Sequence, residues 1–251
     1  MIDLTGKVVL ITGAARGIGE ASARAVVAAG GYVVASDVLE DRLTALQADL
    51  TSDRCRLDVC DLADVETVPY MWERAVDWRG SIDVLVNNAG VYEEAPIEGD
   101  FQVWHTSWMR TLNINLVAAA ALCREAIHHF QQQGGGKIIN IASRAGFRGD
   151  LPDYTHYAAS KGGMLALSRT IARGFADKNI LVYAIAPGFV RTELNTEYFH
   201  RYGEESAISQ TPLKEMAMPE DIANVVVFLA SDLARHVTGA TIDVNGASYV
   251  R

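Results

Sequence analysis

The chain has 251 residues, 49% of them hydrophobic, which is enough for one large core, and we expect a single domain over residues 1–251. The formal net charge of −9 comes with no basic stripe, which argues against nucleic acid and anionic membranes as partners. Three cysteines without a CxxC pair, and an N-terminus without an apolar signal segment, predict a reducing, cytoplasmic location.

The first predicted elements are a buried strand and a glycine-rich turn. Residues 7–12 form a short apolar, β-branched run, typical of a central strand that is covered on both faces. Gly13, Gly17 and Gly19 follow, where the backbone must bend sharply and a phosphate must approach main-chain N–H groups. The turn therefore predicts an anion site at the N-terminus of the next helix.

A helix over residues 18–29 and a second strand over residues 32–36 complete this first unit. Asp37 stands at the end of the second strand, roughly 20 residues after the turn, where a dinucleotide-binding fold places an acidic residue on the ribose hydroxyls. The glycine spacing departs from GxGxxG, and alone it would also suit an ordinary strand-to-helix turn. The combination of strand, turn, helix, strand and Asp37 predicts nucleotide binding.

Strands and helices go on alternating through the rest of the chain. Further strands are predicted at residues 54–59, 82–86, 137–142, 180–186 and 240–244, and helices at residues 40–50, 61–78, 101–133, 154–177 and 219–231. This alternation is the signature of a doubly wound parallel sheet. We therefore predict an α/β, Rossmann-type fold of about seven strands with helices on both faces.

Residues 189–218, which follow Pro187-Gly188, form a polar stretch with scattered aromatic side chains. A long insertion at the ligand edge of a sheet is more often functional than structural. We predict that this segment is a mobile substrate lid.

Tyr157 and Lys161 are four residues apart on a predicted helix, which puts both on one face with their Cβ atoms about 5–6 Å apart. A nearby positive charge favours the phenolate, so Tyr157 is predicted to act as a base near neutral pH. A solvated surface pair would have the same spacing, and the pair gains its meaning only from its context.

The order and spacing of several motifs resemble the short-chain dehydrogenases/reductases over essentially the whole chain. These motifs are the glycine turn, Asn87-Asn88-Ala89-Gly90, Ser143, the Tyr157/Lys161 pair and Pro187-Gly188. The resemblance implies hydride transfer between a nicotinamide cofactor and a substrate carbon, with the accompanying proton moved by the protein.

The same resemblance implies a catalytic group of Ser143, Tyr157 and Lys161, with Asn115 as a fourth member. In that family the tyrosine exchanges a proton with the substrate oxygen and the serine hydrogen-bonds that oxygen. The lysine lowers the pKa of the tyrosine and binds the nicotinamide ribose, and Asn115 would hold a water in a proton relay.

Cofactor contacts are also implied by the resemblance. They are expected at Gly13, Arg16, Gly17, Ile18, Gly19, Asp37, Asp58, Val59, Asn87, Ala89, Gly90, Tyr157, Lys161, Pro187, Gly188, Val190 and Thr192. Thr192 would contact the nicotinamide carboxamide, and Asp58 and Val59 the adenine. A loop hydroxyl, a strand-end cap and a core valine are the structural alternatives for these three residues.

The choice between NAD and NADP rests on Asp37 and Arg16. A carboxylate accepts two ribose hydroxyls but repels a 2′-phosphate, so Asp37 favours NAD, whereas Arg16 is a feature that NADP-dependent members of the family often share. Because repulsion in a partly dry cleft outweighs an unpaired exposed arginine, we expect NAD as the cofactor, with NADP less favoured.

The sequence thus predicts an NAD(H)-dependent oxidoreductase that interconverts a secondary alcohol and a ketone, with Tyr157 as acid and base. An NADPH-dependent ketone or 3-oxoacyl reductase is the alternative enzyme, and a catalytically silent dinucleotide sensor is the alternative of another class. No metal site is expected, since the adjacent His128 and His129 face different sides of a helix. By the resemblance, the two long helices would pack in a homotetramer.

Overall fold

A computed structural model describes residues 2–251 of the chain. Its core is one seven-stranded sheet in which every neighbouring pair of strands is parallel. The strands are β1 (Val8–Thr12), β2 (Tyr32–Asp37), β3 (Cys55–Val59), β4 (Val84–Asn87), β5 (Gly136–Ile141), β6 (Ile180–Pro187) and β7 (Thr241–Val244). The spatial order is β3-β2-β1-β4-β5-β6-β7. The predicted α/β fold is confirmed.

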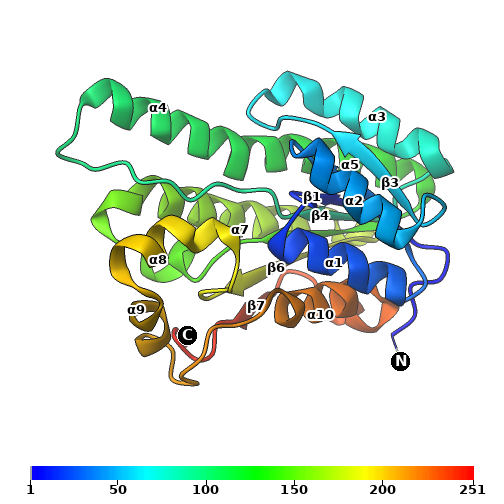
Figure 1. Cartoon of the computed structure of the whole chain (residues 1–251). Coiled ribbons are helices and arrows are strands. Elements are labelled where there is room, and N and C mark those ends of the chain that lie inside the picture. Colours follow the sequence, from blue (N-terminus) through cyan, green and yellow to red (C-terminus); the bar gives the residue numbers. More distant parts are fainter. Residues whose placement is uncertain (1) are drawn as a thin grey trace.

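Helices cover both faces of this sheet (Figure 1). The main helices are α1 (Gly17–Ala28), α2 (Glu40–Leu50), α3 (Val68–Arg79), α5 (Ala118–Gln133), α7 (Thr155–Phe175) and α10 (Pro219–Ala230). Side chains alternate along β1, so Val9 and Ile11 pack toward α1, α2 and α10, while Val8 and Leu10 pack toward α3, α5 and α7. Because both faces are buried at the centre of the sheet, β1 and β6 are almost continuous apolar runs, whereas the edge strands β3 and β7 include exposed polar residues.

The long helix predicted over residues 101–133 is divided into three parts. An α-helix, α4 (Phe101–Leu112), is followed by a π-helical turn, η2 (Asn113–Val117), and then by α5. π-Helical turns are rare and occur frequently at functional sites, because the wider turn redirects side chains. Asn115 lies in this turn.

The segment predicted as a lid, residues 189–218, contains two short helices, α8 (Thr196–Tyr202) and α9 (Glu204–Ser209). Phe189 packs against Tyr198 with ring centres 4.7 Å apart. Figure 1 shows α8 below α7, and α9 next to α8, on the side of the molecule away from the N-terminus. Movement of this segment stays a prediction.

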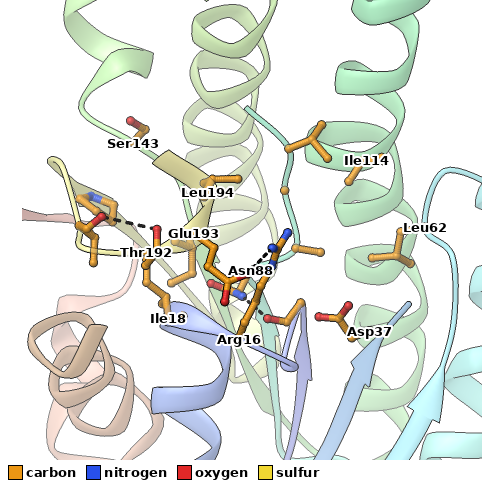
Figure 2. A pocket seen from close by; sticks show the side chains of 18 of the residues that line it. Arg16, Ile18, Asp37, Leu62, Asn88, Ile114, Ser143, Thr192, Glu193 and Leu194 are labelled. Atoms are coloured by element: carbon orange, nitrogen blue, oxygen red, sulfur yellow. Dashed lines mark hydrogen bonds and ion pairs between the residues drawn. The ribbon is translucent and has the colours of Figure 1, made fainter. Parts of the chain in front are cut away.

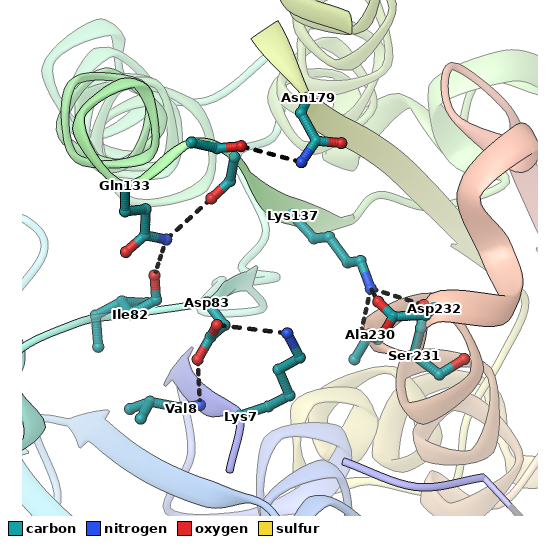
Figure 3. A network of polar contacts seen from close by, with 12 residues as sticks. Lys7, Val8, Ile82, Asp83, Gln133, Lys137, Asn179, Ala230, Ser231 and Asp232 are labelled. Carbon is teal, nitrogen blue, oxygen red and sulfur yellow. Dashed lines mark hydrogen bonds and ion pairs between the residues drawn. The ribbon is translucent and has the colours of Figure 1, made fainter. Parts of the chain in front are cut away.

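A polar network lies at the amino ends of strands β4 and β5 (Figure 3). The Lys137 ammonium donates hydrogen bonds to the carbonyl oxygens of Ala230 (2.8 Å) and Ser231 (2.7 Å) at the end of α10, and to Asp232 Oδ1 (2.9 Å). Nearby, Asp83 Oδ2 accepts from the Val8 amide at 2.8 Å. These contacts join helix α10 and strand β1 to the amino ends of β5 and β4.

Across residues 2–251, no helix has the length and apolar character needed to cross a membrane. The strand order reverses between β1 and β4, since the chain adds β2 and β3 on one side of β1 and the later strands on the other. Ligands of open α/β sheets bind outside the carboxyl ends of the strands at such a reversal.

Candidate active site

A cleft of about 290 Å³ lies at this point of the sheet. Ser143 lines one end of it, Asp37 the other, and Arg16, Thr192 and Glu193 lie between them (Figure 2). Thirteen of the predicted cofactor residues line the cleft: Gly13, Arg16, Gly17, Ile18, Asp37, Ala89, Gly90, Tyr157, Lys161, Pro187, Gly188, Val190 and Thr192. The sequence motifs, which are far apart along the chain, therefore meet in one cavity.

The glycine turn is built for close backbone packing. Gly13 and Gly17 have φ angles of +65° and +56°, which side chains disfavour. A Cβ on Gly13 would lie 2.8 Å from Ala89 Cα, and one on Gly19 would lie 2.0 Å from the Gly13 carbonyl oxygen. Gly17 and Ile18, which begin α1, line the cleft, and the N-terminus of a helix suits the phosphates of a dinucleotide.

Asn88 holds this turn in place, a role that the sequence analysis missed. Its side-chain amide donates to the carbonyl oxygens of Thr12 (2.9 Å) and Gly13 (3.0 Å), and Thr12 Oγ1 accepts from the Asn88 amide at 3.1 Å. The two carboxyl-terminal turns of β1 and β4 are thus joined directly.

Both carboxylate oxygens of Asp37 are occupied by backbone donors. Oδ2 accepts from the Ala15 amide at 3.0 Å, and Oδ1 accepts from the amides of Val38 (2.8 Å) and Leu39 (3.2 Å). These three bonds disperse the negative charge of Asp37, which was expected to repel a 2′-phosphate.

Two arginines meet beside Asp37 on one acidic residue. Arg16 Nη1 lies 2.9 Å from Glu193 Oε2, and Arg42 Nη1 lies 2.6 Å from Glu193 Oε1. All three side chains are about half exposed, and the pair of arginines lowers the pKa of Glu193. Arg42, on α2, was not singled out from the sequence, although it stands five residues after Asp37.

Four predicted cofactor residues do not line the cleft. Gly19 packs on the glycine turn, and Asn87 Nδ2 donates to Asn140 Oδ1 at 2.8 Å inside the core. Asp58 Oδ1 pairs with Arg74 Nε at 2.7 Å, while Val59 is exposed beside it. Adenine contacts by Asp58 and Val59 stay a prediction.

The proposed catalytic side chains come from two elements. Ser143 follows β5, and Tyr157 and Lys161 lie one turn apart on α7. Lys161 Nζ donates to the carbonyl oxygen of Ile141 at 2.8 Å and lies 5.7 Å from the centre of the Tyr157 ring. The Ser143 hydroxyl accepts from the Ala145 amide at 3.1 Å. All three side chains face the cleft.

Burial dominates the ionisation of this group. It raises the pKa of Tyr157 to about 12, against a hydrogen bond with Ser143 that lowers it. It also lowers the pKa of Lys161 to about 8, because the ammonium is held away from water. The direction at Tyr157 is opposite to the sequence expectation, since Lys161 points to the Ile141 carbonyl. In the protein alone, burial therefore favours the neutral phenol of Tyr157.

Asn115 is fully buried behind the cleft. Its Oδ1 accepts from the Val91 amide at 2.8 Å, and its Nδ2 donates to the Val91 carbonyl at 3.0 Å and to Ser160 Oγ at 3.3 Å. A Cβ on Gly90 would lie 3.3 Å from Asn115 Oδ1. Asn115 therefore fixes the backbone after β4, and its part in a proton relay stays a prediction.

A smaller pocket of about 40 Å³ opens beside Ser143 and Tyr157, which line both cavities. Its walls include Tyr92, Arg144 and Phe189. The sequence analysis did not single out Arg144, whose only signal is its place directly after Ser143.

Comparisons with known proteins agree with this geometry. A family model described as enoyl-(acyl carrier protein) reductase matches residues 13–247. The 3-oxoacyl-[acyl-carrier-protein] reductase FabG of Rickettsia felis is 37% identical over 246 residues, covering 98% of each chain. The enzyme of the same name from Thermotoga maritima is 36% identical over 249 residues, covering 98% of this chain and 99% of its own.

Solved structures give the same result. A putative NAD(P) dependent gluconate 5-dehydrogenase from Beutenbergia cavernae, with bound NADP at low occupancy, has a TM-score of 0.91 and 33% identity over 98% of both chains. A short-chain dehydrogenase/reductase from Brucella melitensis, described as a glucose/ribitol dehydrogenase, has a TM-score of 0.90 and 32% identity, covering 100% of this chain and 99% of its own.

These findings overturn one prediction. The preference for NAD over NADP is wrong, because the Beutenbergia structure contains NADP and the curated relatives carry the name of the 3-oxoacyl reductases, the class that formed the alternative. The physical reason lies in the surroundings of Asp37: three backbone donors disperse its charge, and two arginines, held by Glu193, lie beside it. The family model and the relatives match essentially the whole length, and the chain belongs to the short-chain dehydrogenase/reductase family.

Proposed function

We propose that the chain catalyses NADP(H)-dependent interconversion of a ketone and a secondary alcohol, with Tyr157 as the proton donor in reduction. The observation that carries the proposal is the place of Tyr157, which lies with Ser143 and Lys161 in the cleft that also contains the glycine turn, where burial raises its pKa to about 12. A phenol held in its neutral form is suited to donating a proton to a carbonyl oxygen.

The chemistry divides between cofactor and protein. A bound nicotinamide cofactor supplies or accepts the hydride. Ser143 orients the substrate carbonyl by donating a hydrogen bond from its hydroxyl, and Tyr157 gives its proton to the same oxygen as negative charge develops there. The Lys161 ammonium then lies near the phenolate that remains and stabilises it, since opposite charges interact strongly in a partly dry site.

The proposed place of the cofactor follows from the residues that line the cleft. The glycine turn would hold the pyrophosphate, and Asp37 would lie beside the adenosine ribose. Arg16 and Arg42 would bind the 2′-phosphate in place of Glu193, whose two oxygens now bridge them. The lid over residues 189–218 would then be linked to cofactor binding, because Glu193 belongs to it.

The names of particular relatives favour two classes of substrate. The curated relatives from Rickettsia felis and Thermotoga maritima are named as 3-oxoacyl-[acyl-carrier-protein] reductases and match 98% of this chain. The structural relative from Beutenbergia cavernae is named for gluconate, a hydroxy acid. A 3-oxoacyl thioester and an oxo or hydroxy acid are therefore the substrate classes to compare first.

We also propose that the chain acts as a homotetramer in the cytoplasm. Helix α4 and the π-helical turn after it carry large apolar side chains that are 43–63% exposed: Phe101, Val103, Met109 and Val117. Burial of these side chains against further copies would remove apolar area from water. A monomer in light scattering would rule out the assembly.

Turnover of ketones with NADPH and with NADH tests the proposed function. We expect reduction with NADPH, loss of nearly all turnover in Tyr157→Phe, and retention of NADP binding in that variant. Tyr70→Phe is the matched control, because Tyr70 is an exposed tyrosine on α3. Tight NADP binding without turnover of any ketone or alcohol would instead favour a dinucleotide sensor.

A further inference from the structure

The smaller pocket contains a buried cation that no carboxylate pairs with. Arg144 is 4% exposed, and within residues 2–251 no carboxylate oxygen lies within ion-pair distance of its guanidinium group. Its Nη1 is buried and has no hydrogen-bond partner among these residues. A buried charge without a partner is costly, so its retention beside the catalytic group needs a reason.

The backbone and packing around Arg144 hold this guanidinium in place. The Arg144 amide donates to the Pro187 carbonyl at 3.0 Å, and the Arg144 carbonyl accepts from Phe147 and Arg148 in the short helix α6 (Ala145–Arg148). The guanidinium carbon lies 4.9 Å from the centre of the Phe189 ring. The cation is therefore held between the end of β5 and the lid.

Among residues 2–251, the acceptor that hydrogen-bonds the Arg144 guanidinium is neutral and is shared with a second arginine. Gln210 Oε1 lies 3.3 Å from Arg144 Nη2 and 3.2 Å from Arg148 Nη2. The amide is oriented by its Nε2, which donates to Tyr198 Oη at 3.2 Å and to the Ser206 carbonyl at 3.1 Å. Two positive groups thus converge on a single uncharged oxygen.

Asp150 lines the same pocket and attracts both Arg144 and Arg148 through its charge, although it forms no ion pair with either. Its Oδ1 accepts from the Leu151 amide at 2.9 Å, and its Oδ2 lies 3.5 Å from Tyr92 Oη. Burial raises the pKa of Asp150 and lowers that of Arg144 to about 10. Counted formally, the pocket holds two positive groups and one negative group, and its excess charge is positive.

We propose that Arg144 binds a carboxylate of the substrate, which makes the enzyme a reductase of short oxo acids and a dehydrogenase of the matching hydroxy acids. This inference rests on the proposed function, since it names the substrate class of the same site. A carboxylate matches the planar fork of donors on a guanidinium group. It would complete the hydrogen bonding of the free Nη1.

The pocket is small, about 40 Å³ against about 290 Å³ for the main cleft, so it suits a compact planar group such as a carboxylate. Ser143 and Tyr157 line the pocket and the main cleft alike. A short oxo acid can therefore place its carboxylate on Arg144 and its ketone oxygen on the catalytic hydroxyls.

The test compares short oxo acids with their methyl esters as substrates, with NADPH as reductant. We expect a kcat/KM for the acids at least about tenfold above that for the esters, since hydrogen bonds to charged groups contribute this much. Arg144→Met should abolish the preference, and Arg144→Lys should retain part of it. Arg56→Met, which removes an exposed arginine from edge strand β3, should keep it fully.

A second measurement uses binding rather than turnover. With NADP present, an oxo acid should raise the melting temperature of the wild type and of Arg56→Met, but not of Arg144→Met, and the ester should have little effect. Equal effects of acid and ester, in either measurement, would overturn the assignment of Arg144. Faster reduction of esters or of 3-oxoacyl thioesters would overturn it and leave the proposed function intact. Absence of any reduction would count against the proposed function, and the melting temperatures with acid and ester would then decide whether Arg144 binds a carboxylate.

Discussion

Two buried ionisable side chains of the catalytic group, Tyr157 and Lys161, are shifted toward their neutral forms for the same reason. Burial penalises phenolate and ammonium alike, so the pKa of Tyr157 rises to about 12 and that of Lys161 falls to about 8. The two groups are matched to a reaction in which the proton leaves Tyr157 only as charge develops. At that moment a charged Lys161 lowers the barrier most.

These shifts predict how activity depends on pH. Tyr157 keeps its proton up to about pH 12, whereas Lys161 is charged below about pH 8 and neutral above it. We therefore expect kcat/KM for ketone reduction to fall as the pH rises through about 8, because the cation that stabilises the phenolate is lost. The measurement is a pH profile of kcat/KM with NADPH saturating. A profile that stays level to pH 10 would remove Lys161 from this role.

Arg42 provides a second prediction at the scale of a residue. If its guanidinium exchanges Glu193 for the 2′-phosphate, Arg42→Met should raise the KM for NADPH up to about fivefold, the size expected of one exposed charge pair. The KM for NADH should change little, because NADH lacks that phosphate.

Kinetics with both cofactors, repeated at low and high salt, measure this difference. High salt should reduce the effect of the substitution, because it screens exposed charges. Arg56→Met is again a suitable control. Equal changes in both KM values would show that Arg42 supports the cofactor site without binding the 2′-phosphate.

At the scale of elements, the amino end of β5 is tied to the carboxyl end of α10 through Lys137. The Lys137 side chain is 11% exposed. Its ammonium donates to two carbonyl oxygens at the end of the helix and to Asp232. Burial lowers the pKa of Lys137, against the pull of Asp232. A cation at the C-terminus of a helix is favourable both for the free carbonyls and for the helix dipole.

Lys137→Met should therefore lower the free energy of unfolding by about 1–3 kcal/mol, since it leaves buried acceptors without a donor. Urea unfolding at neutral pH measures the change. Lys178→Met, on an exposed 3₁₀ turn, should change stability by less than about 0.5 kcal/mol. Equal stability of the two variants would mean that water satisfies the acceptors when Lys137 is removed.

Elements were predictable where local pattern and tertiary structure agree. The buried strands follow from apolar runs, and the glycine turn from its spacing. The division of the helix after Leu112 was not predictable, because residues 113–117 continue the helical periodicity and only packing around Asn115 and Val91 selects the wider turn. The same limit applies to Lys161, whose ammonium bonds a carbonyl oxygen that sequence spacing does not reveal.

Across the whole molecule, the position of the cleft was predictable from the sequence, but the side-chain contacts within it were not. The alternation of strands and helices places the motifs at one edge of the sheet. Glu193 and Arg16, in contrast, are 177 residues apart, and the meeting of Arg144 with Gln210 depends on how the lid packs. Such pairings carry no local signal, which is why cofactor preference was mispredicted from Asp37 and Arg16 alone.

The cleft also couples cofactor binding to the stability of the whole chain. Its lining runs from Gly13 to Asn195 and includes both halves of the sheet, so a ligand held there is lost when the molecule unfolds. At a concentration of 100 times its Kd, NADP should stabilise the folded state by about 2.7 kcal/mol and raise the melting temperature by about 5–10 °C.

Thermal melting with NADP and with NAD at equal concentrations measures this coupling, and NADP should give the larger shift. Gly17→Ala should reduce the shift, because φ is +56° at this position and an added Cβ would lie 3.1 Å from the Thr192 side chain. Ala166→Gly, on the exposed face of α7, controls for a simple loss of stability. A larger shift with NAD, or an unchanged NADP shift in Gly17→Ala, would mean that the dinucleotide does not use the glycine turn and the two arginines as argued.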